Sequence, residues 1–215
     1  MGRSRNIAIV IPAFNEEKTI SNIVKAVKKY GYPIVVDDGS LDKTANEAEK
    51  SGAIVEKHLK NLGYDNALNT GFKKALKIKC DFIITLDADG QHEPKLLQTF
   101  IDTLEEGSSI VLGVRNKKAR LAEYLFGFYT KYRYGIIDPL CGFKAYKTKN
   151  YRAIGYFDSF KSIGTELMIR NIASGVKFKQ IYFNIKKRND KTRFGNSIVA
   201  NLKIIRSLFY CIVKI

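Results

Sequence analysis

The chain of 215 residues has no tryptophan, four prolines and three cysteines. The cysteines, Cys80, Cys141 and Cys211, are odd in number and widely spaced, and no Cys-x-x-Cys pair occurs. This scarcity argues against a disulfide framework and predicts reduced thiols in a cytoplasmic protein. No run reaches the roughly 18 apolar residues that a membrane-spanning helix needs, and we expect no signal peptide before the first apolar run. Any membrane contact is therefore expected to be peripheral.

Acidic residues are scarce in the second half of the chain. Residues 115–215 hold 22 lysines and arginines but only 5 aspartates and glutamates, a net charge of +17, whereas residues 1–114 hold 15 and 16, a net charge of −1. A solubilising lysine surface does not explain why only one half is basic. We expect the second half to meet something anionic, such as a membrane surface, a phosphorylated substrate or a nucleic acid.

Short apolar runs alternate with amphipathic segments in the first half. The runs predict strands at 7–11, 33–36, 53–55, 82–86 and 110–114, and the periodic segments predict helices at about 15–27, 42–52, 66–79 and 94–106. Asn15 is expected to cap the first helix, whose first turn would carry Glu16 and Glu17. This alternation predicts an α/β fold with a mostly parallel central sheet and helices on both faces.

The pattern changes after Arg115. Residues 119–137 are rich in aromatic side chains, and strands at 142–146 and 178–185 and a helix at 165–173 are predicted. Residues 197–213 predict an amphipathic helix. Its apolar face would hold Ile198, Leu202, Ile205, Phe209 and Ile212, and another face Lys203, Arg206 and Lys214. No linker, repeat or low-complexity tract appears, so we expect one domain over residues 1–215.

Acidic clusters follow three of the predicted strands. The most informative is segment 87–92, in which Asp87 and Asp89 are separated by one residue and followed by a glycine. Two carboxylates at the end of a strand suit Mg²⁺ or Mn²⁺, with phosphate oxygens completing the coordination. A solvated turn is the alternative for each cluster alone. Because the carboxyl ends of parallel strands share one edge of a sheet, three clusters there favour a ligand site.

The order of these segments is specific. Segments 12–16, 36–40 and 87–92 resemble the motif series of family 2 glycosyltransferases, and segments 112–115 and 138–144 resemble later motifs of the dolichyl-phosphate mannose and glucose synthase branch. The resemblance spans about residues 7–195 and implies a Rossmann-like A-type glycosyltransferase fold. It implies a nucleotide-sugar half at about 1–114, an acceptor half at about 115–195 and a tail helix at about 196–215.

The resemblance also implies roles for individual residues. The metal, Mg²⁺ or Mn²⁺, would be held by Asp87, Asp89 and the Gln91 carbonyl. The nucleotide sugar, GDP- or UDP-linked, would be held by Pro12, Asn15, Glu16, Asp37, Asp38, Asp87, Ala88, Asp89 and, more loosely matched, Arg193. Segment 63–66 lacks the lysine and second glycine that the family often has before the sequence Ala-Leu-x-x-Gly. Because of this departure, the resemblance does not fix which nucleotide the protein prefers or what role this loop plays.

The acceptor decides which further residues act. A polyprenyl phosphate is already an anionic nucleophile, and the resemblance implies that Arg115, and more weakly Arg120, would bind its phosphate. A saccharide or protein hydroxyl would need a carboxylate base, which Asp138 or Glu166 would supply. For Glu166, a charge in the first turn of a helix is an equally good interpretation.

The basic, amphipathic tail suggests how the protein reaches a lipid. We hypothesise that the 197–213 helix, with segment 119–137, lies in the membrane interface at the cytoplasmic face. The alternative is that the helix packs its apolar stripe on the sheet. Other functions fit less well: a pyrophosphorylase lacks its glycine-rich loop here, a nucleic-acid-binding protein leaves the acidic clusters unexplained, and intact Asp87 and Asp89 argue against a non-catalytic lipid binder. We therefore expect no nucleic-acid partner.

Overall fold

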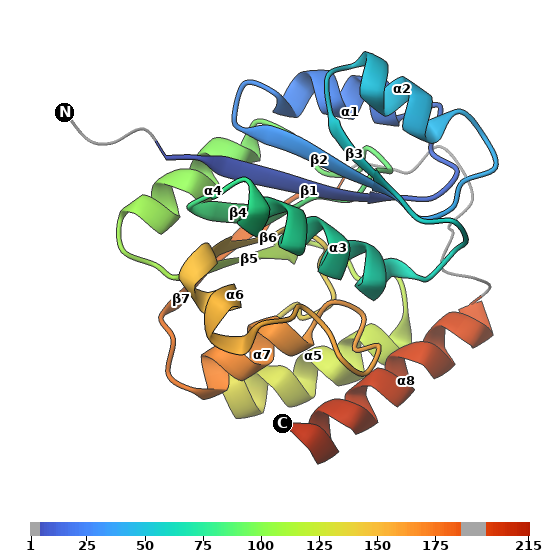
Figure 1. Ribbon diagram of the computed structural model, residues 1–215. Helices are drawn as coiled ribbons and strands as arrows, with labels where there is room; N and C mark the ends of the chain where they lie inside the picture. The colour runs from blue at the N-terminus through green and yellow to red at the C-terminus, as the bar shows by residue number, and fades with distance from the viewer. Residues whose placement is uncertain (1–4, 186–196) are drawn as a thin grey trace.

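The computed structural model describes residues 5–185 and 197–215, which form a seven-stranded sheet covered by helices on both faces (Figure 1). The strands are β1 (Ile7–Ala13), β2 (Tyr32–Asp37), β3 (Ile54–Lys57), β4 (Phe82–Thr85), β5 (Ile110–Arg115), β6 (Lys144–Lys147) and β7 (Phe178–Phe183). The helices are α1 (Ile20–Val27), α2 (Thr44–Lys50), α3 (Tyr64–Lys77), α4 (Leu96–Glu105), α5 (Leu121–Tyr134), α6 (Thr148–Ile154), α7 (Glu166–Ala173) and α8 (Ser197–Lys214).

The strand order is β3-β2-β1-β4-β6-β5-β7. Neighbouring strands are parallel except at β6, which runs antiparallel to β4 and β5. The predicted, mostly parallel α/β sheet is confirmed. This order places the carboxyl ends of β2, β1 and β4 side by side. Because β6 runs the opposite way, the segment that leads into it, which includes Asp138 and Gly142, arrives at the same edge.

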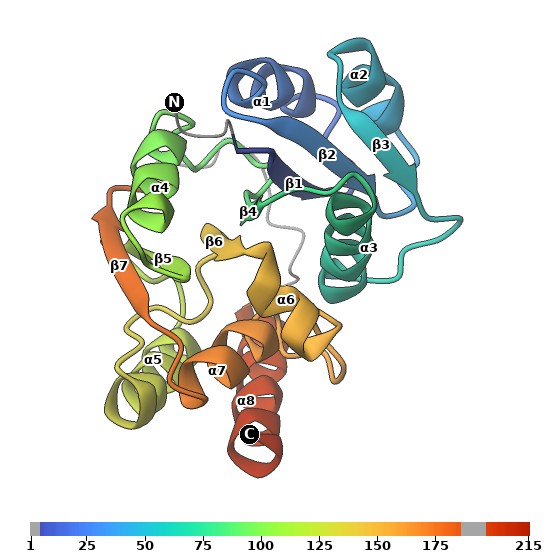
Figure 2. The same ribbon diagram turned by 60° about the vertical axis from the view of Figure 1, so that its left-hand side comes forward.

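Apolar side chains alternate between the two faces of the sheet and form one core on each. On β1, Ile9 and Ile11 pack with α1 and α4, whereas Ala8 and Val10 pack with α3 and the second-half helices α5, α6, α7 and α8. Figure 2 shows α1, α2 and α4 on one side of the sheet, and α3 and α5 to α8 on the other. The period of two along a strand produces this division.

The first helix begins later than the sequence predicts. Asn15 does not cap it, because Asn15 adopts a left-handed backbone with φ of 55° and its Oδ1 accepts a hydrogen bond from the Leu41 amide. Residues 16–19 form a turn in which the amides of Thr19 and Ile20 donate to the Glu16 carbonyl, and α1 then starts at Ile20. The Asn15 side chain thus connects two loops instead of starting a helix.

Two helices in the second half were not predicted. The aromatic segment contains α5, which buries Ala122 and Phe126 and exposes Leu121, Tyr124, Leu125, Phe128 and Tyr132. Its aromatic residues fall on both faces, so a helical period is not apparent in the sequence. The seven-residue α6 is short, which makes it equally hard to recognise from periodicity.

The tail helix α8 packs on the molecule with a different face from its apolar stripe. Ala200, Ile204, Ser207 and Cys211 are buried, and the Ala122 amide of α5 donates to Asn201 Oδ1 at 3.1 Å. The predicted stripe of Ile198, Leu202, Ile205, Phe209 and Ile212 is exposed, each side chain at 48–73%. The alternative in which this stripe packs on the sheet is therefore wrong. Within residues 5–185 and 197–215, no helix is both long and apolar enough to cross a bilayer.

Candidate active site

A pocket of about 470 Å³ opens where the carboxyl ends of β1, β2 and β4 meet. Its lining includes Pro12 near the end of β1, Glu16 in the loop that follows, Asp38 after β2, and Asp87, Ala88 and Asp89 after β4. Of the other residues that the sequence marks, Asn15, Asp37, Gln91 and Asp138 are not among those that line it. The second half contributes Arg115, Arg120, Lys161, Lys203 and Arg206. The first half of the chain thus lines the pocket with carboxylates, whereas the second half lines it with these five cations and one carboxylate, Glu123.

Hydrogen bonds connect the three first-half motifs to one another. The Asn15 amide donates to Ser40 Oγ at 2.9 Å, and the Glu16 amide donates to Thr44 Oγ1 at 2.8 Å. The Thr19 hydroxyl donates to the Ala88 carbonyl at 2.7 Å. Segments that are far apart in sequence are therefore held in one arrangement before any ligand arrives.

The two aspartates at the end of β2, Asp37 within the strand and Asp38 directly after it, both accept hydrogen bonds from backbone amides. Asp37 is buried, and its Oδ1 accepts from the Ser40 amide at 3.1 Å. Asp38 accepts from the amides of Leu62 and Gly63, each at 2.8 Å, and its Oδ1 lies 2.7 Å from His58 Nδ1. Asp38 thereby holds loop 58–63 against the pocket, a contribution that its position in a motif does not indicate.

Asp87 and Asp89 both line the pocket. The Tyr64 hydroxyl donates to Asp87 Oδ1 at 3.3 Å, and Gln91 donates its amide to Asp89 Oδ1 at 3.0 Å. Burial, together with the charges of Asp87 and Asp65, holds the pKa of Tyr64 well above its usual value, so Tyr64 stays a donor. Gly142 lies behind Asp87: a Cβ there would be 2.6 Å from the Asp87 carboxyl carbon.

Asp87 and Asp89 supply some, but not all, of the ligands that a divalent cation needs. Asp87 keeps 31% of its side chain exposed within the pocket, and its carboxylate oxygens are hard ligands. Among the described residues, no group of three or more histidine, cysteine, aspartate or glutamate side chains is arranged to hold a metal. The donor set present here therefore fits a cation that takes its remaining ligands from a bound diphosphate or from backbone oxygens such as the Gln91 carbonyl.

Arg115 is engaged by carboxylates. Its Nε and Nη2 donate to Asp138 at 2.8 and 2.9 Å, and Nη2 also donates to Glu123 at 2.9 Å. Arg120 shares the same Glu123 at 3.2 Å. Burial alone would raise the pKa of Asp138, but the hydrogen bonds and charge of Arg115 outweigh it and hold that pKa below its usual value. Asp138 is 1% exposed and stays ionised.

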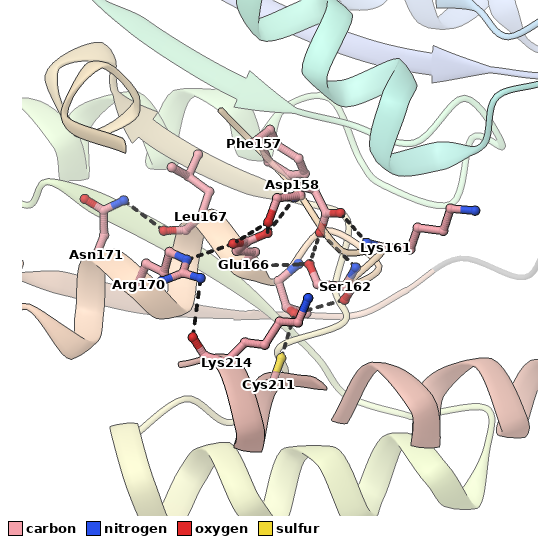
Figure 3. A network of polar contacts seen from close by, with 12 residues as sticks. Phe157, Asp158, Lys161, Ser162, Glu166, Leu167, Arg170, Asn171, Cys211 and Lys214 are labelled. Carbon is pink, nitrogen blue, oxygen red and sulfur yellow. Dashed lines mark hydrogen bonds and ion pairs between the residues drawn. The ribbon is translucent and has the colours of Figure 1, made fainter. Parts of the chain in front are cut away.

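Glu166 holds a loop together and does not line the pocket (Figure 3). It is fully buried, accepts from the Ser159 amide at 2.6 Å and pairs with Arg170 Nε at 2.8 Å. The loop it holds, residues 158–165, has left-handed backbone at Lys161, Ile163 and Gly164. A β-branched residue such as Ile163 rarely adopts this backbone, and such strain tends to gather at functional sites.

A buried lysine and a half-buried aspartate both bind the backbone of Gly164 in that loop. Lys144 Nζ donates to the Gly164 carbonyl at 2.6 Å, and Asp65 accepts from the Gly164 amide at 2.6 Å. Burial lowers the pKa of Lys144 to about 8. Burial, and then the nearby Asp158 carboxylate, raise the pKa of Asp65 to about 7. The strained loop is thus held between two groups that titrate near neutrality.

Several pocket residues were missed by sequence reasoning. Tyr64, Asp65 and Lys161 lie in no acidic or basic motif that would single them out, and only the fold brings them to the pocket that Asp87 also lines. Lys203 and Arg206 were recognised, but as surface charges of a membrane helix. Arg193 lies outside the described residues.

The comparisons with known proteins now decide the family. The model of glycosyl transferase family 2 matches residues 8–173. The chain belongs to glycosyl transferase family 2. An uncharacterized protein of Methanocaldococcus jannaschii is 35% identical to it over 94% of this chain and 90% of that protein. The membership that the motif series predicts is confirmed.

Two further similarities concern chemistry and fold. A dolichol-phosphate mannosyltransferase of Pyrococcus furiosus is 29% identical over 94% of this chain and 63% of that enzyme's length. Other relatives are named for transfer to dolichyl phosphate or undecaprenyl phosphate. Glucosyl-3-phosphoglycerate synthase from Mycobacterium tuberculosis, solved with Mn²⁺, UDP and its product, superposes with a TM-score of 0.76 at 20% identity, over 95% of this chain and 79% of that one. The A-type glycosyltransferase fold is confirmed.

Proposed function

We propose that this glycosyltransferase moves a hexose, with inversion, from a GDP- or UDP-linked sugar to a polyprenyl phosphate of the dolichyl type at a membrane surface. One observation carries the proposal. A single pocket joins the acidic pair Asp87 and Asp89 to the basic side of α8, whose remaining free face is an exposed apolar stripe. Relatives named for transfer to polyprenyl phosphates support the acceptor class.

The donor half of the pocket supplies orientation and charge. Pro12, Glu16 and loop 58–63 would hold the nucleotide, while Asp87 and Asp89, with the Gln91 carbonyl, would hold Mg²⁺ or Mn²⁺ against the diphosphate. When bound, the cation neutralises the charge that develops on the leaving diphosphate. Inverting transfer then needs an acceptor in line behind the anomeric carbon, which is a matter of positioning.

The carboxylates favour a phosphate acceptor over a hydroxyl acceptor. A hydroxyl needs a general base with access to the substrate. Glu166 is buried in contact with Arg170 and Ser159, and Asp138 is ion-paired with Arg115 and has a lowered pKa. We therefore expect Asp138→Asn and Glu166→Gln to keep turnover within tenfold wherever they remain folded. A loss of a thousandfold or more in either would favour the saccharide or protein hydroxyl.

The exposed stripes of two neighbouring helices support a peripheral membrane position. α5 and α8 expose aromatic and aliphatic side chains next to each other, and large apolar patches mark interaction surfaces. The surrounding half of the chain carries a net charge of +17, which suits an anionic bilayer. We propose the cytoplasmic face, consistent with three buried, unpaired cysteines.

Thermal denaturation tests the donor site. We expect Mn²⁺ with one of UDP, GDP, CDP or TDP to stabilise the protein by about 2.7 kcal/mol at a hundred times the dissociation constant. Asp89→Ala should abolish this shift, whereas Glu105→Ala, which removes an exposed carboxylate of α4, should retain it. If no nucleotide gives a metal-dependent shift, the proposed function fails and the basic half becomes the candidate for binding polyanions.

A further inference from the structure

We propose that Ser207 of α8 is a positioning residue for the donor pocket, an inference that rests on the proposed function. Loop 158–165 forms part of the pocket wall, because Lys161 and Ile163 of this loop line the pocket. Ser207 is not among the described residues that line it, but its hydroxyl is hydrogen-bonded to the loop. α8 thus serves the donor site with its buried face, in addition to carrying an exposed apolar stripe.

The loop packs against the proposed cation site and is strained at Ile163. A Cβ at Gly164 would lie 3.2 Å from the ring of Tyr64, whose hydroxyl donates to Asp87. Ile163 has a φ of 57°, in the left-handed region that β-branched residues rarely adopt. Such a conformation persists only where the surroundings hold it. The contacts that hold Ile163 therefore decide how this part of the wall meets a ligand.

Two elements hold the peptide group that links Ser162 to Ile163. Its carbonyl, from Ser162, accepts a hydrogen bond from Ser207 Oγ at 2.7 Å, and both serines are fully buried. Its amide, from Ile163, donates to Asp65 Oδ2 at 3.3 Å. Because a peptide group is planar, its orientation sets the φ of Ile163. Ser207 on α8 and Asp65 on α3 therefore hold the strained residue in place together.

The hydroxyl of Ser207 reaches out of its own helix. A serine within a helix can turn its hydroxyl back to the carbonyl four residues earlier, but Ser207 donates to Ser162. Cys211, about one turn further along, meets the same loop, with its Sγ 3.5 Å from Thr165 Oγ1 (Figure 3). Ile205 of the exposed stripe lies on the other side of the helix. Substitutions can therefore disturb the two faces of α8 separately.

We expect Ser207→Ala to fold, because it removes one of two donors to the Ser162 carbonyl. The Thr165 hydroxyl also donates to this carbonyl, at 2.9 Å, so the buried oxygen keeps a partner. The strained peptide group nevertheless loses a restraint, and Ile163 then leaves its position for part of the time. A role in packing alone would instead lower stability and leave the affinity of the folded protein unchanged.

Calorimetric binding to the full chain tests the assignment. We would titrate UDP and GDP, each with Mn²⁺, into wild type, Ser207→Ala and Cys211→Ala, well below their melting temperatures. Cys211→Ala is the matched control, because it shortens a buried side chain of the same helix face whose contact is with Thr165. Flotation of the same proteins with vesicles containing anionic lipid would report on the exposed face of α8.

We expect Ser207→Ala to bind the nucleotide about fivefold more weakly, the size of effect expected for one neutral hydrogen bond. Cys211→Ala should stay within twofold of wild type, and both variants should float as wild type does. An affinity of Ser207→Ala within twofold of wild type overturns the inference. So does an equal loss of affinity in Cys211→Ala, or a loss of flotation in Ser207→Ala, because either indicates a general effect on α8.

Ile163→Gly tests whether Ser207 acts through the strained residue. Glycine adopts left-handed backbone readily and has no side chain, so this variant should also bind the nucleotide about fivefold more weakly or worse. Adding Ser207→Ala to Ile163→Gly should have no further effect, whereas independent effects would multiply. Multiplied losses overturn the inference. Wild-type affinity in Ile163→Gly does so as well, and decides the question even where Ser207→Ala does not fold.

The wild type separates this failure from failure of the proposed function. If wild type binds UDP or GDP with Mn²⁺ and Ser207→Ala binds it equally well, only the role of Ser207 is wrong. If wild type binds neither nucleotide, the proposed function is wrong, and the role of Ser207 fails with it.

Discussion

Arg115 and Asp138 form a buried two-point ion pair at the edge of the sheet where the pocket opens. Arg115 Nε and Nη2 donate to the two Asp138 oxygens, and the Arg115 amide donates to Oδ2 at 3.1 Å as well. The pair joins the end of β5 to the segment that enters the antiparallel strand β6. It thereby fixes the backbone that carries Gly142 to Asp87.

Removing one charge of this pair should destabilise the protein strongly. We expect Asp138→Asn to lower the free energy of unfolding by about 3–5 kcal/mol at pH 7, because Arg115 would lose a buried partner. Since the folded-state pKa of Asp138 lies below its unfolded value, the stabilisation is present above pH 4 and lost as pH falls through the folded-state pKa. Urea unfolding should show the deficit shrinking toward pH 3, with exposed Asp102→Asn as control. A deficit independent of pH would contradict the ionised pair.

Gly142 is expected to be required for the position of Asp87. A methyl group at residue 142 would overlap the Asp87 carboxylate, so Gly142→Ala should weaken Mn²⁺-dependent nucleotide binding at least tenfold. Relief of the overlap should cost about 1–3 kcal/mol of stability. Cys141→Ser, a change of similar size at the adjacent buried position, should retain binding. Calorimetric titration would measure both, and wild-type affinity in Gly142→Ala would refute the steric argument.

Asp65 should make stability depend on pH near neutrality. Its folded-state pKa of about 7 lies above the unfolded value of roughly 4, so the folded state binds the proton more tightly. Stability should therefore rise as pH falls from about 7 toward 4, by at most about 1.4 kcal/mol per pH unit. Asp65→Asn removes the titration and should flatten this part of the profile. Urea unfolding would measure the free energy of unfolding of wild type and Asp65→Asn at each pH. If the two proteins show the same dependence on pH, Asp65 does not have the raised pKa.

The fold was predictable where one period dominates a segment. The apolar runs of β1, β2 and β4 and the stripe of α4 can be recognised locally, and parallel strands then bring their carboxyl ends together by topology. α5 could not be recognised, because Tyr124 and Phe128 face solvent while Phe126 is buried, so the aromatic pattern hides the helical one.

The site was predictable in its residues more than in its contacts. The acidic pair Asp87 and Asp89 lines the pocket as the motif indicates. Whether a charge meets substrate or another side chain depends on long-range packing, so the sequence could not show that Arg115 is paired with Asp138 and Glu123. The same holds for Glu166, whose position in the first turn of α7 was compatible with either role.

The exposed stripes of α5 and α8 give a prediction for membrane binding that is separate from folding. Leu202 is 62% exposed and Phe128 75%, so Leu202→Ser and Phe128→Ser should leave the melting temperature nearly unchanged. Each removes a side chain worth about 1.5–3 kcal/mol on full burial, and partial burial in the interface should still reduce vesicle binding about fivefold or more. Leu41, which is 94% exposed in the loop after β2 and lies on neither α5 nor α8, provides the matched control Leu41→Ser. Flotation with vesicles containing anionic lipid would measure all three. If the α5 and α8 variants float as wild type does, these helices do not form the membrane contact, and the exposed stripes must be assigned to a protein partner instead.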